Sequence, residues 1–366
     1  MRISRVIIIV LVVVVVVIIA VAASSIVLAP KQNSSAWSAA AEYPVQVGGT
    51  YGIAGQQCVN STAYITCIGG QDIQSGPRSD IYYSSAVSTS GGIATWTLDS
   101  ANPYPKIIDG ESCVTYAGYV YCVGGTYDGA GDDVVASYYA PLASGGGVGN
   151  WSSTTPFPIP VDSQSCVAAT GYMYCVGGDN ETDGTNTDAV ATNSVWYASL
   201  SASGLGTWTP TTGYPVNTFF PSCFSAYGYI YCLGGADEND NSLNAVYFAA
   251  LSPSGVGTWA KTQPYPIQES GQACAFSSGY VYCVGGETSG GNSPSYTNAV
   301  YYAPVSPSGI GAWKQAGVYP LSVGTTCIIS SAHIYCVGGF DSSTEGVESD
   351  VNYASLTSLS ASTTSG

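Results

Sequence analysis

Twelve cysteines fall into six pairs, and in every pair eight residues separate the first cysteine from the second. One aliphatic residue and then two glycines follow the second cysteine of each pair. A spacing that recurs in this way predicts a chain built from six copies of one structural unit. The pairs are Cys58 with Cys67, Cys113 with Cys122, Cys166 with Cys175, Cys223 with Cys232, Cys274 with Cys283, and Cys327 with Cys336.

Each pair is predicted to bridge a β-hairpin. In the second copy, two β-prone runs flank Ala117 and Gly118, which indicate a two-residue turn. Centring the turn there places Cys113 opposite Cys122 on a non-hydrogen-bonded rung, where facing Cα atoms lie about 4.5 Å apart. A disulfide can span that separation. The alternatives are buried free thiols or a metal site, but each repeat offers only two cysteine ligands and the chain has one histidine. Six disulfides predict an oxidising compartment.

The beginning of the chain favours the same compartment. Arg2 and Arg5 precede an uncharged apolar run from Val6 to Ala23. The run suits either a signal peptide or an uncleaved membrane anchor, and both place the remaining chain outside the cell. We therefore expect a leader or anchor over residues 1–30, a propeller over 31–356 and a flexible tail rich in Ser and Thr over 357–366.

The repeat contains four strand-like segments. The cysteine hairpin supplies the first two, a segment with aromatic residues the third, and a segment with tryptophan the fourth. The sixth copy lacks its tryptophan segment, but Trp37 begins an unmatched one near the N-terminus. This N-terminal segment is expected to complete the last unit and close a ring, which favours a propeller over an open solenoid. The fourth-strand tryptophans are Trp96, Trp151, Trp208, Trp259 and Trp313.

Three markers recur in this order: Gly-Gly after the second strand, an aromatic residue in the third and tryptophan in the fourth. They resemble the kelch repeat over roughly residues 36–356. The resemblance implies an all-β, six-bladed β-propeller with four antiparallel strands per blade, whose glycines and aromatics serve packing. The cysteine pair is not part of the kelch pattern. Kelch propellers include partner-binding modules and sugar-active enzymes, so the fold does not select a function.

Acidic residues are predicted to gather on one face. The chain has 23 acidic and 7 basic residues, and most of the acidic ones follow the second strand of a blade. Propeller topology places those loops on the same face as the loops that enter each first strand. This face should repel nucleic acid. Four acidic residues enter first strands and are predicted to lie at the mouth of the central channel, where they are candidate ligand-binding residues: Asp109, Glu111, Asp162 and Glu269.

One acidic loop resembles a calcium-binding loop in its spacing. Asp179, Glu181 and Asp183 alternate and are followed by Gly184. Alternating oxygen ligands before a glycine suit Ca²⁺, although the EF-hand's twelfth-position glutamate is absent. A solvated acidic loop is the alternative. No other cofactor is predicted.

The sequence argues against an enzyme. The single His333 is expected at a hairpin of the weakly charged face, away from carboxylates that a catalytic triad would need. Arg78 is the one arginine beyond the leader, so an arginine cluster for acidic sugars cannot form. Two channel-mouth carboxylates would still suffice for glycoside hydrolysis.

We therefore predict a non-enzymatic recognition or adhesion module at the cell surface, which binds a glycan or a protein and, through an uncleaved leader, the membrane. One alternative is a structural subunit that assembles with copies of itself into a surface filament or layer. The other is a secreted carbohydrate-active enzyme that uses the acidic residues of the channel mouth.

Overall fold

The computed structural model describes residues 36–47, 50–61, 63–72, 76–127, 132–180, 190–288, 295–341 and 346–361. The chain divides into two units, Met1–Asn33 and Ser34–Gly366, and only the second contains described residues. The predicted leader or anchor over residues 1–30 lies outside them. Across the described segments, no helix has both the length and the apolar character needed to cross a membrane.

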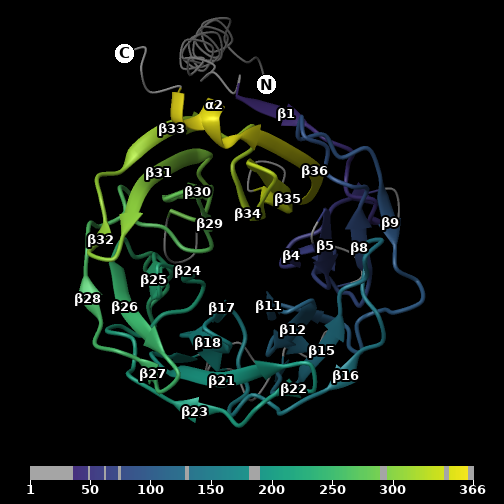
Figure 1. Cartoon of the computed structure of the whole chain (residues 1–366). Coiled ribbons are helices and arrows are strands. Elements are labelled where there is room, and N and C mark those ends of the chain that lie inside the picture. The colour runs from purple at the N-terminus through teal and green to yellow at the C-terminus, as the bar shows by residue number, and fades with distance from the viewer. Residues whose placement is uncertain are drawn as a thin grey trace, which may run out of the picture. The chain divides into compact units, whose positions relative to one another are not determined.

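The second unit is a ring of six antiparallel sheets, the blades of a β-propeller (Figure 1). Blade 1 contains β4 (Gln57–Ser61), β5 (Tyr64–Ile68), β8 (Ile81–Ser84) and β9 (Trp96–Leu98). Blade 2 contains β11 (Ser112–Tyr116), β12 (Tyr119–Val123), β15 (Ser137–Pro141) and β16 (Ser152–Ser153). Blade 3 contains β17 (Ser165–Ala169), β18 (Tyr172–Val176), β21 (Val195–Ser201) and β23 (Thr209–Pro210).

The remaining blades repeat this order. Blade 4 contains β24 (Ser222–Ala226), β25 (Tyr229–Leu233), β26 (Val246–Ser252) and β28 (Ala260–Lys261). Blade 5 contains β29 (Ala273–Ser277), β30 (Tyr280–Val284), β31 (Ala299–Ser306) and β33 (Lys314–Val318). Blade 6 contains β34 (Val323–Ser330), β35 (His333–Asp341), β36 (Gly346–Ser355) and β1 (Trp37–Ala39). The first strands β4, β11, β17, β24, β29 and β34 contact one another in turn around the central channel.

The loops between the blade strands contain further short strands. On one face they are β2 (Gln46–Val47), β3 (Thr50–Tyr51), β6 (Gln71–Asp72), β7 (Gly76–Pro77), β10 (Ile108–Asp109), β13 (Thr126–Tyr127), β14 (Asp132–Asp133), β19 (Asp179–Asn180) and β20 (Val190–Ala191). Between the third and fourth strands of blades 3 to 5 lie β22 (Gly204–Leu205), β27 (Gly255–Val256) and β32 (Gly309–Ile310). The one helix with described residues is α2 (Leu356–Ala361).

The six predicted disulfides are confirmed. In every blade the two cysteines face each other across the first and second strands, and their Cα atoms lie 4.0–4.1 Å apart. The bonds join Cys58 to Cys67, Cys113 to Cys122, Cys166 to Cys175, Cys223 to Cys232, Cys274 to Cys283, and Cys327 to Cys336. They indicate an extracellular or otherwise oxidising environment.

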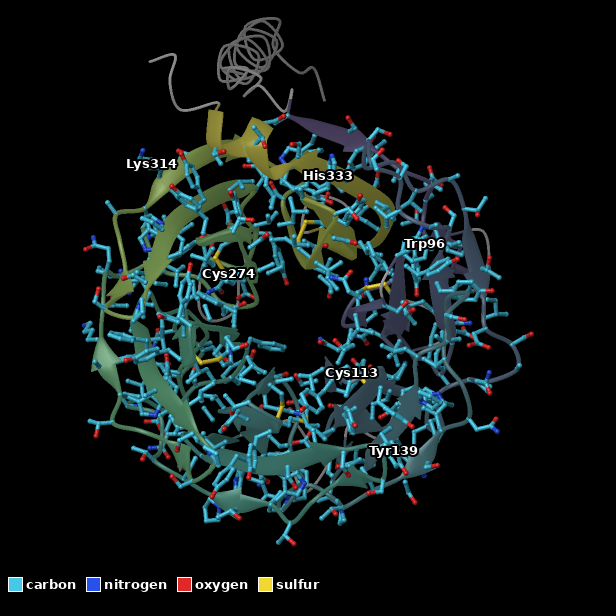
Figure 2. All side chains as sticks on the ribbon, viewed as in Figure 1. Trp96, Cys113, Tyr139, Cys274, Lys314 and His333 are labelled. Carbon is cyan, nitrogen blue, oxygen red and sulfur yellow. A yellow bond between two sulfur atoms is a disulfide. The ribbon has the colours of Figure 1, made fainter. Side chains whose placement is uncertain are left out.

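The disulfides fasten the strands that border the channel. Figure 2 shows Cys113 and Cys274 at the inner edge of the ring, whereas Trp96 and Lys314 lie farther out. The first strand of each blade has a sheet neighbour on one side only. Because the disulfide joins this strand to the second strand, it holds the inner edge of the blade in place.

The glycines after the second strand allow neighbouring blades to approach closely. Gly124 has a φ of +68°, and a Cβ added there would lie 2.5 Å from the Val161 carbonyl oxygen of the next blade. The N–H of Gly125 donates to that same carbonyl at 2.8 Å. A side chain would therefore clash at the point where the backbones of two blades are hydrogen-bonded.

Aromatic pairs fill the space between blades, as the sequence predicted. Each fourth-strand tryptophan packs edge-on against the aromatic residue that follows the fourth strand of the preceding blade. Ring centroids are 4.8 Å apart for Trp151 and Tyr104 and 5.0 Å apart for Trp259 and Tyr214. Such edge-to-face pairs contribute about 0.5–1.5 kcal/mol beyond the burial of their area.

The N-terminal strand closes the ring, which confirms the predicted closure. Strand β1 pairs with β36, with Trp37 opposite Ala354. The Trp37 ring packs 4.8 Å from Tyr319 of the neighbouring blade. The last blade is therefore made from both ends of the propeller.

The C-terminal segment corrects one expectation. The sequence predicts a flexible tail over 357–366, but Leu356–Ala361 form α2, and residues 362–366 lie outside the described part. Leu356 and Leu359 are buried among blades 5 and 6. The Leu356 N–H donates to the Ala332 carbonyl at 3.1 Å, as Leu251 does to Gly228 in blade 4. The helix thus substitutes for the turn that leads from third to fourth strand in other blades.

Candidate functional site

The loops expected on one face are paired with one another there. The segment that enters each first strand bridges to the segment that follows the second strand of the same blade, as in Asp109 with Thr126 and Asp162 with Asp179. These loops surround one mouth of the channel. Of the four predicted channel-mouth residues, Asp109, Glu111 and Asp162 lie close enough for Asp109 to raise the pKa of the other two.

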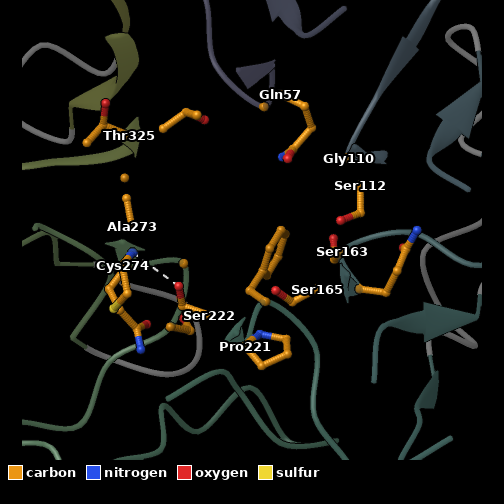
Figure 3. A pocket seen from close by; sticks show the side chains of 18 of the residues that line it. Gln57, Gly110, Ser112, Ser163, Ser165, Pro221, Ser222, Ala273, Cys274 and Thr325 are labelled. Carbon is orange, nitrogen blue, oxygen red and sulfur yellow. Dashed lines mark hydrogen bonds between the residues drawn. The ribbon is translucent and has the colours of Figure 1, made fainter. Parts of the chain in front are cut away.

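A cavity of about 380 Å³ occupies this end of the channel. Its wall consists mainly of small polar residues from the first strands and the loops that enter them, and Figure 3 shows several of them around the opening. Large aromatic side chains also contribute to the wall: Phe220, Tyr296 and Phe340. Glu111 and Glu287 are the acidic residues of the wall.

The two cysteines of a disulfide differ in their relation to this cavity. The first cysteines of blades 2 to 6 belong to its wall: Cys113, Cys166, Cys223, Cys274 and Cys327. The second cysteines are 0–1% exposed and lie outside the wall: Cys67, Cys122, Cys175, Cys232, Cys283 and Cys336. Among the described residues no cysteine is free. The first cysteines of these blades therefore contribute to the wall of the cavity, and as disulfides they offer neither thiolate ligands nor nucleophiles.

Glutamine side chains join neighbouring blades at the level of the wall, and two of them, Gln164 and Gln272, also line the cavity. The Gln164 amide nitrogen donates to the Val123 carbonyl of the preceding blade at 2.8 Å, and Gln272 does the same to Leu233 at 3.0 Å. Gln56 donates to Val337 at 2.7 Å across the closure of the ring. In each case the carbonyl belongs to the residue that follows the second cysteine.

Glu111 occupies the equivalent position in blade 2. Its side chain is 1% exposed, and neither carboxylate oxygen has a hydrogen-bond partner among the described residues. Burial raises the pKa of Glu111 well above its usual value, and the nearby Asp109 carboxylate adds to the shift. Burial therefore favours the uncharged form of Glu111 more than it is favoured in an exposed glutamate.

Asp109 and Asp162 form a second, partly buried acidic group on neighbouring loops. Burial raises the pKa of Asp162 to about 7; a hydrogen bond from Thr126 opposes this shift and Asp179 adds to it. The Thr126 hydroxyl donates to Asp162 Oδ2 at 2.9 Å. Burial also raises the pKa of Asp109 to about 6. These groups therefore titrate in a range where ordinary aspartates are already ionised.

Glu269 does not lie where the sequence analysis predicts it. The sequence predicts it at the channel mouth, but its side chain is 0% exposed and does not line the cavity. It occupies the position at which Ile108 and Val161 are buried in other blades. Burial raises its pKa well above the usual value, and the neighbouring Tyr265 hydroxyl partly offsets the shift.

The predicted calcium loop is described only in part. Asp179 belongs to β19, where its backbone pairs with Ala191, whereas Glu181 and Asp183 lie outside the described residues. Among the His, Cys, Asp and Glu side chains of the described segments, no three are grouped in a way that could hold a metal ion. Calcium binding by this loop stays a prediction.

The remaining candidate residues have structural partners. Arg78 forms ion pairs with Asp72, at 2.7 Å, and with Asp80. His333 lies at a hairpin, where its ring packs 5.9 Å from that of Tyr353. The placement of His333 agrees with the hairpin position expected from the sequence, whereas the ion pairs of Arg78 were not predicted.

Phe220 is the wall residue that sequence reasoning missed. It is 47% exposed although apolar, and its φ is +50°. A signal was available, because the third position before the first cysteine is glycine in blades 1, 2, 5 and 6 and serine in blade 3. An aligned comparison of the six loops would have shown Phe220 as the exception.

Comparisons with known proteins support the fold. No family model matches the chain, and no curated protein matches it. The solved structure of a protein named YjhT is similar, with a TM-score of 0.67 and 14% sequence identity, over 86% of this chain and 96% of that chain. At this identity the similarity shows a shared β-propeller fold and carries no information about function.

Proposed function

We propose that the chain is a non-enzymatic, kelch-like recognition module at the outer surface of the cell, which binds a glycan or a protein on its acidic face. The observation that carries this proposal is the cavity at the channel mouth, where polar and aromatic side chains converge. Concave sites with a few convergent polar groups are the usual ligand sites of proteins. The six disulfides support an extracellular position.

The test is binding of the full-length chain to arrays of glycans and surface proteins. We expect saturable binding that weakens in Glu287→Gln, because Glu287 lines the cavity. Glu42→Gln is the matched control, since Glu42 is exposed and does not belong to the wall. Absence of binding on every array would contradict the proposal. Ordered polymers in electron micrographs of the same preparation would instead identify a structural subunit.

One observation favours a second candidate, a carbohydrate-active enzyme. Asp109 and Asp162 adjoin the wall residues Gly110 and Ser163. Burial raises their pKa values to about 6 and about 7, and carboxyl groups that are still partly protonated near neutral pH can act as general acids. Release of reducing sugar from oligosaccharides, abolished by Asp162→Asn and by Glu111→Gln, would support the enzyme. Binding without turnover would support the recognition module.

A further inference from the structure

Phe220 places an apolar ring in a wall that is otherwise mostly small and polar. The corresponding residues of blades 1, 2 and 5 are Gly55, Gly110 and Gly271, with φ values of +71°, +68° and +62°. Phe220 adopts the same left-handed conformation, with a φ of +50°. For a bulky residue this conformation costs on the order of 1–3 kcal/mol. The fold therefore retains a ring that is both strained and half-exposed.

Backbone hydrogen bonds hold the strained residue in place. The Phe220 N–H donates to the Ser163 carbonyl at 2.9 Å, and its own carbonyl accepts from the Gly271 N–H at 3.2 Å. The loops of blades 3, 4 and 5 are thus linked through Phe220. Because both neighbours fix the backbone, the ring is presented to the cavity from a rigid support.

Three serines of the wall accept hydrogen bonds from the neighbouring blade. Ser112 Oγ accepts from the Cys166 N–H and Ser165 Oγ from the Cys223 N–H, both at 3.0 Å. Ser222 Oγ accepts from the Cys274 N–H at 3.1 Å (Figure 3). Within the described residues, none of the three donates a hydrogen bond in return. Each hydroxyl is therefore oriented by its neighbour and keeps its proton for a ligand.

Acceptors lie in the next layer of the wall. Gln164 and Gln272 use their amide nitrogens to join blades, which leaves their Oε1 atoms buried and without a hydrogen-bond partner among the described residues. Both side chains are less than 10% exposed, at 5% and 3%, yet they border the cavity. These oxygens have almost no accessible surface, so they add polarity behind the wall and are not direct contacts of a ligand.

The charge of the wall narrows the class of ligand. Its acidic side chains are Glu111 and Glu287, and none of the described wall residues is Lys, Arg or His. An anionic ligand would meet carboxyl groups without a compensating cation. Tyr296 and Phe340, with centroids 5.6 Å apart, add a second aromatic surface.

We propose that the channel cavity binds one ring of a neutral saccharide, stacked on Phe220 and hydrogen-bonded to the hydroxyls of Ser165 and Ser222 on the first strands of blades 3 and 4. A sugar ring offers an apolar face to an aromatic residue and hydroxyls that both donate and accept. This inference rests on the proposed recognition function and assigns its ligand class and site.

The experiment uses saturation-transfer NMR and calorimetry on the full-length chain with matched sugars. The neutral probes are glucose, galactose, mannose and N-acetylglucosamine, the anionic probes are glucuronate and galacturonate, and the cationic probe is glucosamine. We expect binding by at least one neutral sugar and none by the uronates. Preference for a uronate or for glucosamine, or no binding by any neutral sugar at millimolar concentration, would overturn the proposal.

Variants identify the site. Phe220→Ala should weaken binding of the neutral sugar by about tenfold or more, as loss of an aromatic anchor does. Phe220→Gly removes the ring and also the strain, so a folded protein is expected even if Phe220→Ala is unstable. Tyr227→Ala is the matched control, since Tyr227 is 54% exposed with a φ of +54° but is not part of the wall. Equal affinity in the Phe220 and Tyr227 variants would exclude this site.

The outcomes separate this inference from the function on which it rests. If the arrays show binding that survives Phe220→Ala, recognition stands and the channel site is wrong. If the arrays show no binding and no sugar binds, both proposals fail.

Discussion

At the scale of the residue, Glu111 illustrates how one substitution in a repeat changes the chemistry of a site. Three blades place a glutamine at its position, and each donates an amide hydrogen to the blade before it. Glu111 can make the equivalent bond, to the Ile68 carbonyl, only when it is protonated. Its raised pKa and its position in the repeat therefore have a common explanation.

We expect Glu111→Gln to raise the free energy of unfolding at pH 7 by about 1 kcal/mol, because the amide donates the hydrogen bond without the cost of keeping a carboxyl group protonated. The gain should shrink towards zero in acid, where the carboxyl group is protonated in both states. Urea unfolding at neutral and at acidic pH measures it. Gln164→Glu is the reverse change at an equivalent site. It should lower the free energy of unfolding at pH 7 and leave it unchanged in acid. A loss of stability in Glu111→Gln at pH 7 would contradict this account.

At the scale of the element, the last blade depends on two segments from opposite ends of the propeller. Strand β1 supplies its outer strand, and α2 covers the place of its missing turn. In other blades a tyrosine hydroxyl donates to the turn of the next blade, as Tyr231 does to Ser306 at 2.7 Å. In blade 5, Tyr302 donates to the Ser360 carbonyl of α2 at 3.3 Å. The helix therefore continues the contact between blades.

Leu359→Ala should lower the free energy of unfolding by about 2–4 kcal/mol, because Leu359 is 0% exposed and its loss leaves a cavity. Thr357→Ala, on the exposed side of the same helix, should change it by less than about 0.5 kcal/mol. Chemical denaturation of both variants is the measurement. Equal, small effects would show that the helix does not contribute to the blade.

Trp37→Ala should lower the free energy of unfolding by about 3–4 kcal/mol. It should also weaken the pairing of β1 with β36, where the ring closes. Hydrogen exchange is expected to accelerate in β36, which pairs with β1, before it does so in blade 3. Ser38→Ala is the control, because Ser38 is exposed in the same strand. Uniform acceleration in all blades would instead indicate that the ring opens as a whole.

At the scale of the whole molecule, buried carboxyl groups predict a protein that is more stable in acid than at neutral pH. The folded-state pKa values of Asp109 and Asp162 are about 6 and about 7, and those of Glu111 and Glu269 are also raised, whereas unfolded carboxyls titrate near pH 4. Between these values the folded state binds more protons. The contribution of these carboxyl groups to stability is therefore fully present below about pH 4, and it is lost as the pH rises through about 7.

The melting temperature is accordingly expected to be higher at pH 4 than at pH 7, as measured by calorimetry. The net charge of −16 at pH 7 acts in the same direction, since protonation reduces repulsion within the fold. Asp162→Asn should reduce the difference between the two pH values. A melting temperature that rises from pH 4 to pH 7 would show that the burial of these groups does not govern stability.

The sequence alone determined the features that depend on repeated local chemistry. The cysteine spacing, the turn between the paired cysteines and the displaced Trp37 segment specify the hairpins, the disulfides and the closure of the ring. These are interactions between neighbouring strands, and a pattern that occurs six times shows them without coordinates. The packing roles of the glycine pairs, the tryptophans and His333 were predicted for the same reason.

Only the tertiary structure decided the features that depend on how deeply a side chain is buried and on which distant segments of the chain it contacts. Glu111 and Glu269 are both glutamates just before a first strand, yet Glu111 borders the cavity and Glu269 is buried in a position that other blades fill with apolar residues. The tail sequence is polar, but two leucines of α2 find a surface left open by the missing turn. Phe220 became a candidate only when its backbone conformation and exposure were known. Burial and desolvation arise from groups far apart in sequence, so spacing along the chain does not encode them.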